Sequence, residues 1–156
     1  MGTAFNNATD IVKFHELPIW FPNVVLGQHS FKGCSSLQEI TFPTLQTSVP
    51  SCFDGCSSLK KVYLNEGLTA TVYGSFAGSA NNIRIFFPTT FTTFASNWTG
   101  TSNRNYYVIM ASETVIANTP GTYIIAAYVP DGSVDAYKAA WTNVASKIKP
   151  MSEYDE

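Results

Sequence analysis

The sequence is poor in charge. Its 156 residues include nine lysines and arginines and eleven aspartates and glutamates, so charged residues make up 13% of the chain, about half the usual fraction of a soluble domain. The net charge is −2 and no basic stripe is present, which excludes nucleic acid as an expected partner. A membrane-spanning helix needs about 18 consecutive apolar residues. No apolar run in the sequence approaches this length, so we expect no membrane insertion.

Groups that carry catalysis are also scarce. The two histidines, His15 and His29, stand outside any recognisable catalytic pattern, and the acidic residues are few and scattered. The nucleophile-elbow, zinc-protease and phosphate-loop motifs are all missing. We therefore expect no catalytic residues and no cofactor, and we keep a small enzyme only as a third functional alternative.

What the chain does contain is a repeated aromatic residue followed two positions later by glycine. The four pairs are spaced by 22, 23 and 22 residues and are Phe31 with Gly33, Phe53 with Gly55, Phe76 with Gly78, and Trp98 with Gly100. Self-similarity at 20–30 residues is typical of a solenoid, whose stacked coils make a long ribbed surface suited to recognition. The first two copies, FKGCSSLQEITFP (31–43) and FDGCSSLKKVYLN (53–65), share six identical positions.

The other copies are more divergent. Residues 76–88 keep the aromatic, the glycine and the apolar positions of the strand, and the copy that begins at Trp98 is expected to turn Tyr107 and Ile109 inward. A further copy opens the chain at Phe5, with Phe14 where the clearer copy has Ile40.

Each copy predicts one short strand. The alternating, β-branched segment turns Leu37, Ile40 and Phe42 inward, and the glycine occupies a turn that needs a positive φ. The aromatic residue before that glycine fills the core between coils. The fold class is therefore an α/β repeat solenoid, mostly β, in one domain (1–150), with clear coils over 29–122 and a divergent coil over 1–28.

The last third predicts a strand and a helix (123–149). Apolar residues recur at helical spacing and Pro150 ends the pattern; they are Val134, Tyr137, Trp141, Val144 and Ile148. The apolar stripe must be buried, so we expect this helix to cover the open end of the core. Residues 151–156 are interpreted as a loose acidic tail.

The outward strand positions predict a binding surface. If the strands align, two rows form: Thr41, Tyr63, Phe86 and Val108 in one, and Glu39, Lys61, Arg84 and Tyr106 in the other. Exposed aromatic residues in a contiguous patch mark contact sites, so we expect this face to bind a partner. The alternative is that a neighbouring domain or chain covers it.

The three cysteines, Cys34, Cys52 and Cys56, fit best as small buried residues. Cys34 and Cys56 occupy the same position in successive copies, so they stack in the core. A Cys34–Cys56 disulfide is the alternative. A zinc site would need better ligand spacing and a histidine pair, so we expect no metal.

The motif FKGCSSLQEITFP resembles the BspA-type leucine-rich repeat of surface proteins from gut and oral, Bacteroides-like bacteria. The resemblance covers 29–95 and, through the YVPDGSVDAYK ending, 123–149. It implies a leucine-rich-repeat solenoid with one strand per coil, and a non-catalytic role in adhesion to a protein or glycan partner at the cell surface. The first residues lack a secretion signal, and phage proteins carry similar repeats, so a structural or host-recognition part of a virion, held in a larger assembly, is the alternative function.

Overall fold

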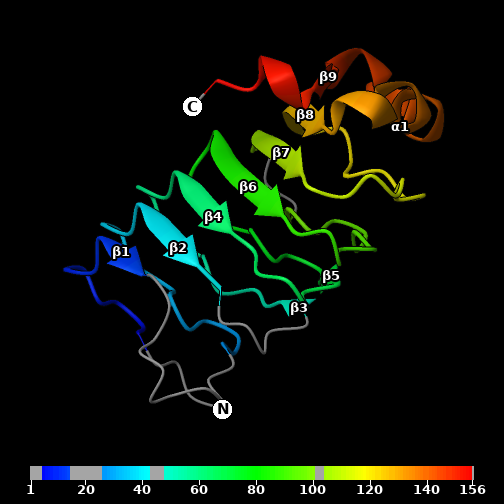
Figure 1. Cartoon of the computed structure of the whole chain (residues 1–156). Coiled ribbons are helices and arrows are strands. Elements are labelled where there is room, and N and C mark those ends of the chain that lie inside the picture. Colours follow the sequence, from blue (N-terminus) through cyan, green and yellow to red (C-terminus); the bar gives the residue numbers. More distant parts are fainter. Residues whose placement is uncertain (1–4, 15–25, 43–47, 101–103, 156) are drawn as a thin grey trace.

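The computed structural model describes residues 5–14, 26–42, 48–100 and 104–155. They form a stack of coils, and each coil adds one short strand to a parallel sheet (Figure 1). The seven strands, in spatial order, are β1 (Lys13–Phe14), β2 (Glu39–Thr41), β4 (Lys61–Tyr63), β6 (Ile83–Phe87), β7 (Tyr106–Met110), β8 (Ile124–Val129) and β9 (Ile148–Pro150). A second, two-stranded sheet on another side of the stack joins β3 (Ser48–Val49) to β5 (Ala70–Thr71).

The pairing of the strands confirms how the first copies align. Phe14 pairs with Ile40, Ile40 with Val62, and Val62 with Ile85. All four side chains are buried and belong to the single apolar core. The divergent opening copy is therefore a coil of the same stack, although its residues 1–4 and 15–25 lie outside the described part.

The repeated aromatic residues form a column through this core. The ring of Phe31 lies 5.2 Å from Phe5 and 6.3 Å from Phe53, and the next centroid separations are 5.3 Å to Phe76 and 5.5 Å from Phe76 to Trp98. The first four rings are stacked and the tryptophan meets Phe76 edge-on. The prediction that these side chains fill the space between coils is confirmed.

The glycine that follows each ring adopts the left-handed backbone that the sequence predicted. The φ angles are +75° at Gly33, +81° at Gly55, +71° at Gly78 and +79° at Gly100. In the opening coil Asn7 takes this place with φ +60°, and asparagine is one of the few side chains that tolerate it.

The expected orientation of the fourth strand was wrong. Val108, not Tyr107, pairs with Ile85, so Tyr106, Val108 and Met110 turn inward. The segment that leads into β7 holds one more residue than the same segment of the coil before it. A shift of one residue exchanges the two faces of a strand.

The predicted helix is also shorter than expected. A 3-10 turn, η1 (Asp131–Ser133), leads into α1 (Val134–Ala140), a second 3-10 segment η2 (Thr142–Lys147) follows, and Ile148–Pro150 is strand β9, paired with β8. The backbone leaves the helical region at Trp141, whose φ and ψ are −106° and 56°. Pairing with β8 satisfies backbone hydrogen-bonding groups of residues 148–150. The apolar residues at 137, 141, 144 and 148 are buried in the core, as the stripe predicted.

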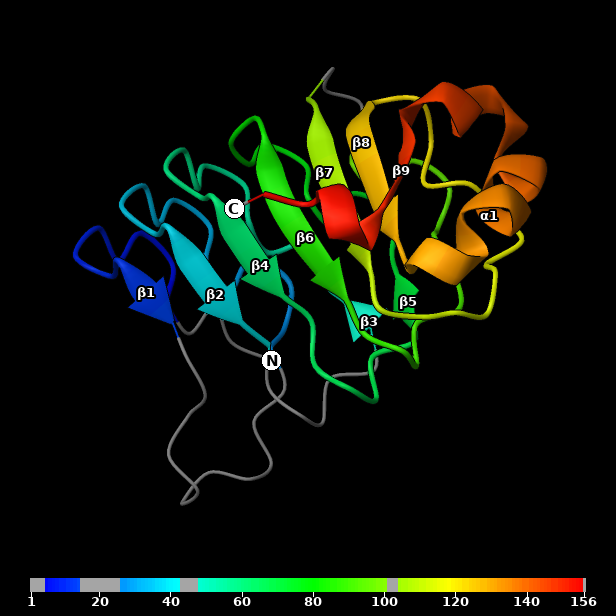
Figure 2. The ribbon, with the colours of Figure 1, turned by 45° about the horizontal axis from the view of Figure 1, so that its top comes forward.

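The described part of the tail is ordered, which corrects the expectation of a loose end. After η3 (Met151–Glu153), the chain returns over the outer face of the sheet (Figure 2). The ring of Tyr154 lies 6.0 Å from Phe86 and 5.0 Å from Tyr128. The Ser152 amide donates a hydrogen bond of 3.0 Å to the Asp131 carboxylate, and this bond raises the acidity of Asp131 by holding its pKa below the ordinary value.

Candidate functional site

The outer face of the large sheet carries two rows of side chains set by strand register. The charged row runs across β1 to β7 and consists of Lys13, Glu39, Lys61, Arg84 and Tyr107. The aromatic row runs across β2 to β8 and consists of Thr41, Tyr63, Phe86, Ile109 and Tyr128. Adjacent parallel strands lie about 4.8 Å apart, so neighbours in a row are in reach of one another.

Two expected members of these rows lie inside the core instead. Tyr106 is fully buried and its hydroxyl donates a hydrogen bond of 3.1 Å to the Phe76 carbonyl, while Val108 is buried beside it. The same burial raises the pKa of the Tyr106 phenol. Tyr107 and Ile109 take the outer positions, because the extra residue before β7 shifts its alignment by one position. An asparagine precedes the strand in both copies, Asn82 and Asn105, but it stands four residues after the glycine in one copy and five in the next, so it did not fix the alignment.

Aromatic contacts link the outer face from β4 to β8. The rings of Tyr63 and Phe86 are stacked, with centroids 4.5 Å apart and an interplanar angle of 14°. Tyr154 of the tail then spans Phe86 and Tyr128. Ile109, which belongs to the row between these two, is 5% exposed. The C-terminal part of this face is therefore covered by the chain's own tail, which the sequence did not predict.

The charged row is held by contacts along the surface. Lys13 lies 3.7 Å from the Glu39 carboxylate, and the Arg84 guanidinium lies 5.1 Å from the centroid of the Tyr107 ring. The cation over a ring face is attracted by the electron-rich π-system. Glu39, Lys61 and Arg84 are half-buried, as are Tyr63 and Phe86. The part of the face between β2 and β6 is thus partly accessible, and strand register fixes the positions of its side chains.

The cysteines lie apart from this face. All three are buried and free, and the Cys34 and Cys56 thiols each donate to a backbone carbonyl of the coil before, at 3.0 Å from the oxygens of Phe5 and Phe31. The interpretation of stacked core residues is confirmed, and the structure has no Cys34–Cys56 disulfide. Within the described ranges, no three His, Cys, Asp or Glu side chains gather as a metal site would require.

We expect the native protein to resist thiol reagents. Burial raises the pKa of Cys56 from 9.0 to about 12 and raises that of Cys52 as well, because an apolar interior disfavours the thiolate. At about pH 8, iodoacetamide should leave Cys52 and Cys56 unmodified in the folded protein and alkylate all three cysteines in urea, as mass spectrometry would show. Rapid alkylation of folded Cys56 would contradict its burial.

The same shift fixes the sign of a stability change. The pKa of Cys56 is higher in the folded than in the unfolded chain. Its contribution to the free energy of unfolding is therefore fully present below about pH 9 and is lost as the pH rises toward 12. The unfolded chain then releases protons that the folded chain still holds, which lowers the free energy of unfolding.

Of the two histidines, the structure describes His29, which forms no further site. His29 is exposed, adopts φ +61° in a turn, and donates its backbone amide to the Ser51 carbonyl at 3.0 Å. His15 lies outside the described residues. In the described part of the chain, no helix has the length and apolar character needed to cross a bilayer.

Comparison with protein families matches residues 3–119, in six copies, to the BspA type leucine-rich repeat region. The chain belongs to this family. The BspA-type repeat accounts for the parallel strands and the aromatic column, and leucine-rich repeats of this kind are typically non-catalytic interaction modules, often associated with cell surfaces. Neither a curated protein nor a solved structure matches the chain significantly.

Proposed function

We propose that this BspA-type repeat domain is a non-catalytic adhesion module that binds a protein through the outer face of its sheet between β2 and β6. The observation that supports the proposal is the stacked pair Tyr63 and Phe86, half-buried and set beside the charged row. Tyrosine and arginine are enriched at the positions of protein interfaces that contribute most to affinity. Arg84, in the charged row beside these two rings, is therefore included in the proposed binding surface.

The charge pattern favours a protein over other partners. Glu39, Lys61 and Arg84 follow one another across three strands, so both signs of charge are presented in a fixed order. A protein partner with the complementary order would be guided to one register by these charges. We place the partner outside the cell, because BspA-type repeats are typically surface-associated.

The test is a double substitution, Tyr63→Ser with Phe86→Ser. Once a partner is captured from host-surface or bacterial-surface extracts, we expect the double variant to bind it at least about tenfold more weakly in surface plasmon resonance, because the aromatic contact is lost. Tyr73→Ser is the matched control, since this tyrosine is 62% exposed in the turn after β5, outside the face.

Circular dichroism and thermal melting of each variant check that the fold is intact. Unchanged affinity in a folded double variant would remove this face from consideration. Binding should also weaken at high salt, because the charged row is close to solvent.

A further inference from the structure

Outside the large sheet, the coils of the stack are joined in two different ways. Between earlier coils, backbone groups bond directly: the Phe31 amide donates to the Cys52 carbonyl at 3.2 Å, and the Phe76 amide to the Trp98 carbonyl at 3.1 Å. Such bonds hold two coils in contact along their length. Among the described residues, one junction between coils lacks such backbone bonds.

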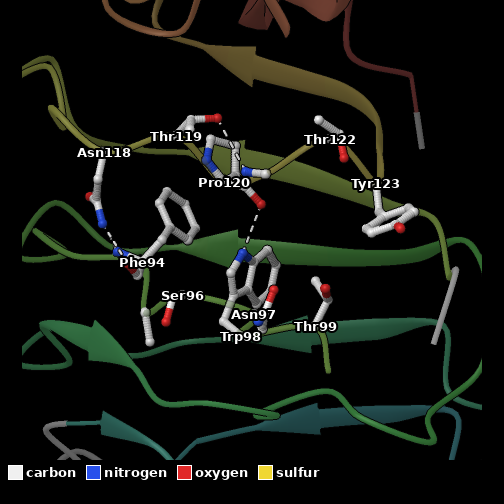
Figure 3. A pocket seen from close by; sticks show the side chains of 12 residues that line it. Phe94, Ser96, Asn97, Trp98, Thr99, Asn118, Thr119, Pro120, Thr122 and Tyr123 are labelled. Atoms are coloured by element: carbon white, nitrogen blue, oxygen red, sulfur yellow. Dashed lines mark hydrogen bonds between the residues drawn. The ribbon is translucent and has the colours of Figure 1, made fainter. Parts of the chain in front are cut away.

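That junction, here called the seam, lies between residues 89–100 and 112–122. In the described part of the chain, no backbone-to-backbone hydrogen bond crosses it. Side chains bridge it instead: the Asn118 amide donates to the Phe94 carbonyl and accepts from the Phe94 amide, and the Trp98 indole donates to the Pro120 carbonyl at 2.8 Å (Figure 3). Residues 112–122, which lead from β7 to β8, are thus joined to the coil before them through side chains.

Two grooves lie along the seam. The larger, of about 430 Å³, is lined by residues 94–99 and 118–123. The smaller, of about 290 Å³, is lined by 89–92, 112 and 114–117 of the same two coils. The Asn118 bridge lies where one set of residues gives way to the other, so the grooves follow one another along the seam.

The larger groove presents hydrogen-bonding groups that the protein does not use. The side chains of Ser96, Asn97 and Thr122 make no hydrogen bond within the described residues and reach the groove (Figure 3). Asn97 holds a left-handed backbone with φ +49°, in a turn where its carbonyl accepts the Gly74 amide at 3.0 Å. At the rim, the ring of Tyr123 is 43% exposed.

The described lining of both grooves contains no charged side chain. The charged groups recorded beside the grooves are already bonded to the protein: Lys147 donates to the Thr122 and Ile124 carbonyls, and the Glu66 carboxylate accepts from the Thr89 amide and hydroxyl. A charged ligand would have to break these bonds to gain an opposite charge, so a neutral ligand is favoured. Amides and hydroxyls beside an exposed aromatic ring match a ligand that is itself neutral, rich in hydroxyl groups and apolar on one face. A pyranose sugar has these properties.

We propose that the seam binds a neutral oligosaccharide. One sugar lies with its C–H face on the Tyr123 ring and exchanges hydrogen bonds with Ser96, Asn97 and Thr122. The chain of sugars continues past Asn118 into the smaller groove, which Thr89, Thr92 and Thr114 line. The Thr89 and Thr92 hydroxyls donate to Glu66 and to the Thr69 carbonyl, so toward a sugar they act as acceptors. The site is separate from the outer face of the sheet, so neither proposal depends on the other.

The experiment measures binding of the full chain to uncharged hexose and N-acetylhexosamine oligosaccharides by glycan array and then by saturation-transfer NMR. We expect at least one of these oligosaccharides to bind, and Tyr123→Ala to weaken it at least about tenfold. Tyr73→Ala is the matched control, an exposed tyrosine in the turn after β5 that lines neither groove. Asn97→Gly removes the amide while keeping the backbone angle, and it should also weaken binding.

Two further measurements separate this site from the proposed protein-binding face. Tyr63→Ser with Phe86→Ser should leave oligosaccharide binding unchanged, and raising the salt concentration should not weaken it, because the ligand carries no charge. Absence of binding to every neutral oligosaccharide at about millimolar concentration would overturn the proposal. So would binding that a folded Tyr123→Ala variant retains, or binding confined to sulfated and carboxylated sugars.

Discussion

Phe53→Ala is expected to lower the free energy of unfolding by about 3–5 kcal/mol, as for other fully buried aromatic residues. The Phe53 ring lies in the middle of the aromatic column, 6.3 Å from Phe31 and 5.3 Å from Phe76, and meets Phe42 edge-on at 5.9 Å. The side chain is 1% exposed. Removing it leaves a cavity between two hydrogen-bonded coils, which cannot move together to fill the space.

Urea unfolding followed by circular dichroism measures this change. Tyr73→Ala is the control, because a ring that is 62% exposed should cost little when it is removed. A loss below about 1 kcal/mol for Phe53→Ala would mean that the column does not hold the coils together.

Gly100→Ala is expected to have the second large effect, a loss of about 2–5 kcal/mol. The backbone at Gly100 has φ +79°, which costs about 1–2 kcal/mol for a residue with a Cβ. The new Cβ would also lie 2.7 Å from the Ala77 Cβ and 3.0 Å from its Cα. Ala77 is fixed by the bond from its amide to the Gly74 carbonyl, at 3.0 Å, so relieving the clash must disturb the turn.

Two other glycines separate strain from crowding. Gly121 has φ +89° but a Cβ there would meet no described atom within 4 Å, so Gly121→Ala should show the backbone cost alone. Gly132 has neither feature, and Gly132→Ala should be nearly neutral. The loss of unfolding free energy should therefore be smallest for Gly132→Ala, larger for Gly121→Ala and largest for Gly100→Ala. Equal losses at Gly100 and Gly121 would show that contact between coils contributes nothing.

The coils with clear copies could be predicted because their information is local. An aromatic residue, a glycine with positive φ and alternating apolar positions recur within each copy, so Phe14, Ile40 and Val62 were aligned before any contact was known. The strand β7 could not be aligned in this way, because its lead-in holds one extra residue. Only pairing with β6 decides which of Tyr106 and Tyr107 is buried.

The candidate surface shows the same limit. Tyr63, Phe86, Lys61 and Arg84 lie on the outer face as the alignment predicted, because residues 76–88 keep the spacing from the aromatic residue to the strand that residues 53–65 have. Tyr154 covers the neighbouring part of this face by packing on Phe86 and Tyr128. The sequence could not predict this contact, because the residues around Tyr154 would look the same in an acidic tail that makes no contacts. Its position depends on rings from strands far away in the chain.

The sequence by itself determined the period of the coils, the aromatic column, the left-handed glycines and the family, because each depends on residues within one repeat. The tertiary structure decided the register of β7, the end of α1 at Ala140, the position of the tail and the opening of the seam. These four features depend on contacts between segments that are distant in sequence. The free energy of such contacts is set by how surfaces fit when the chain is folded, which no local pattern records.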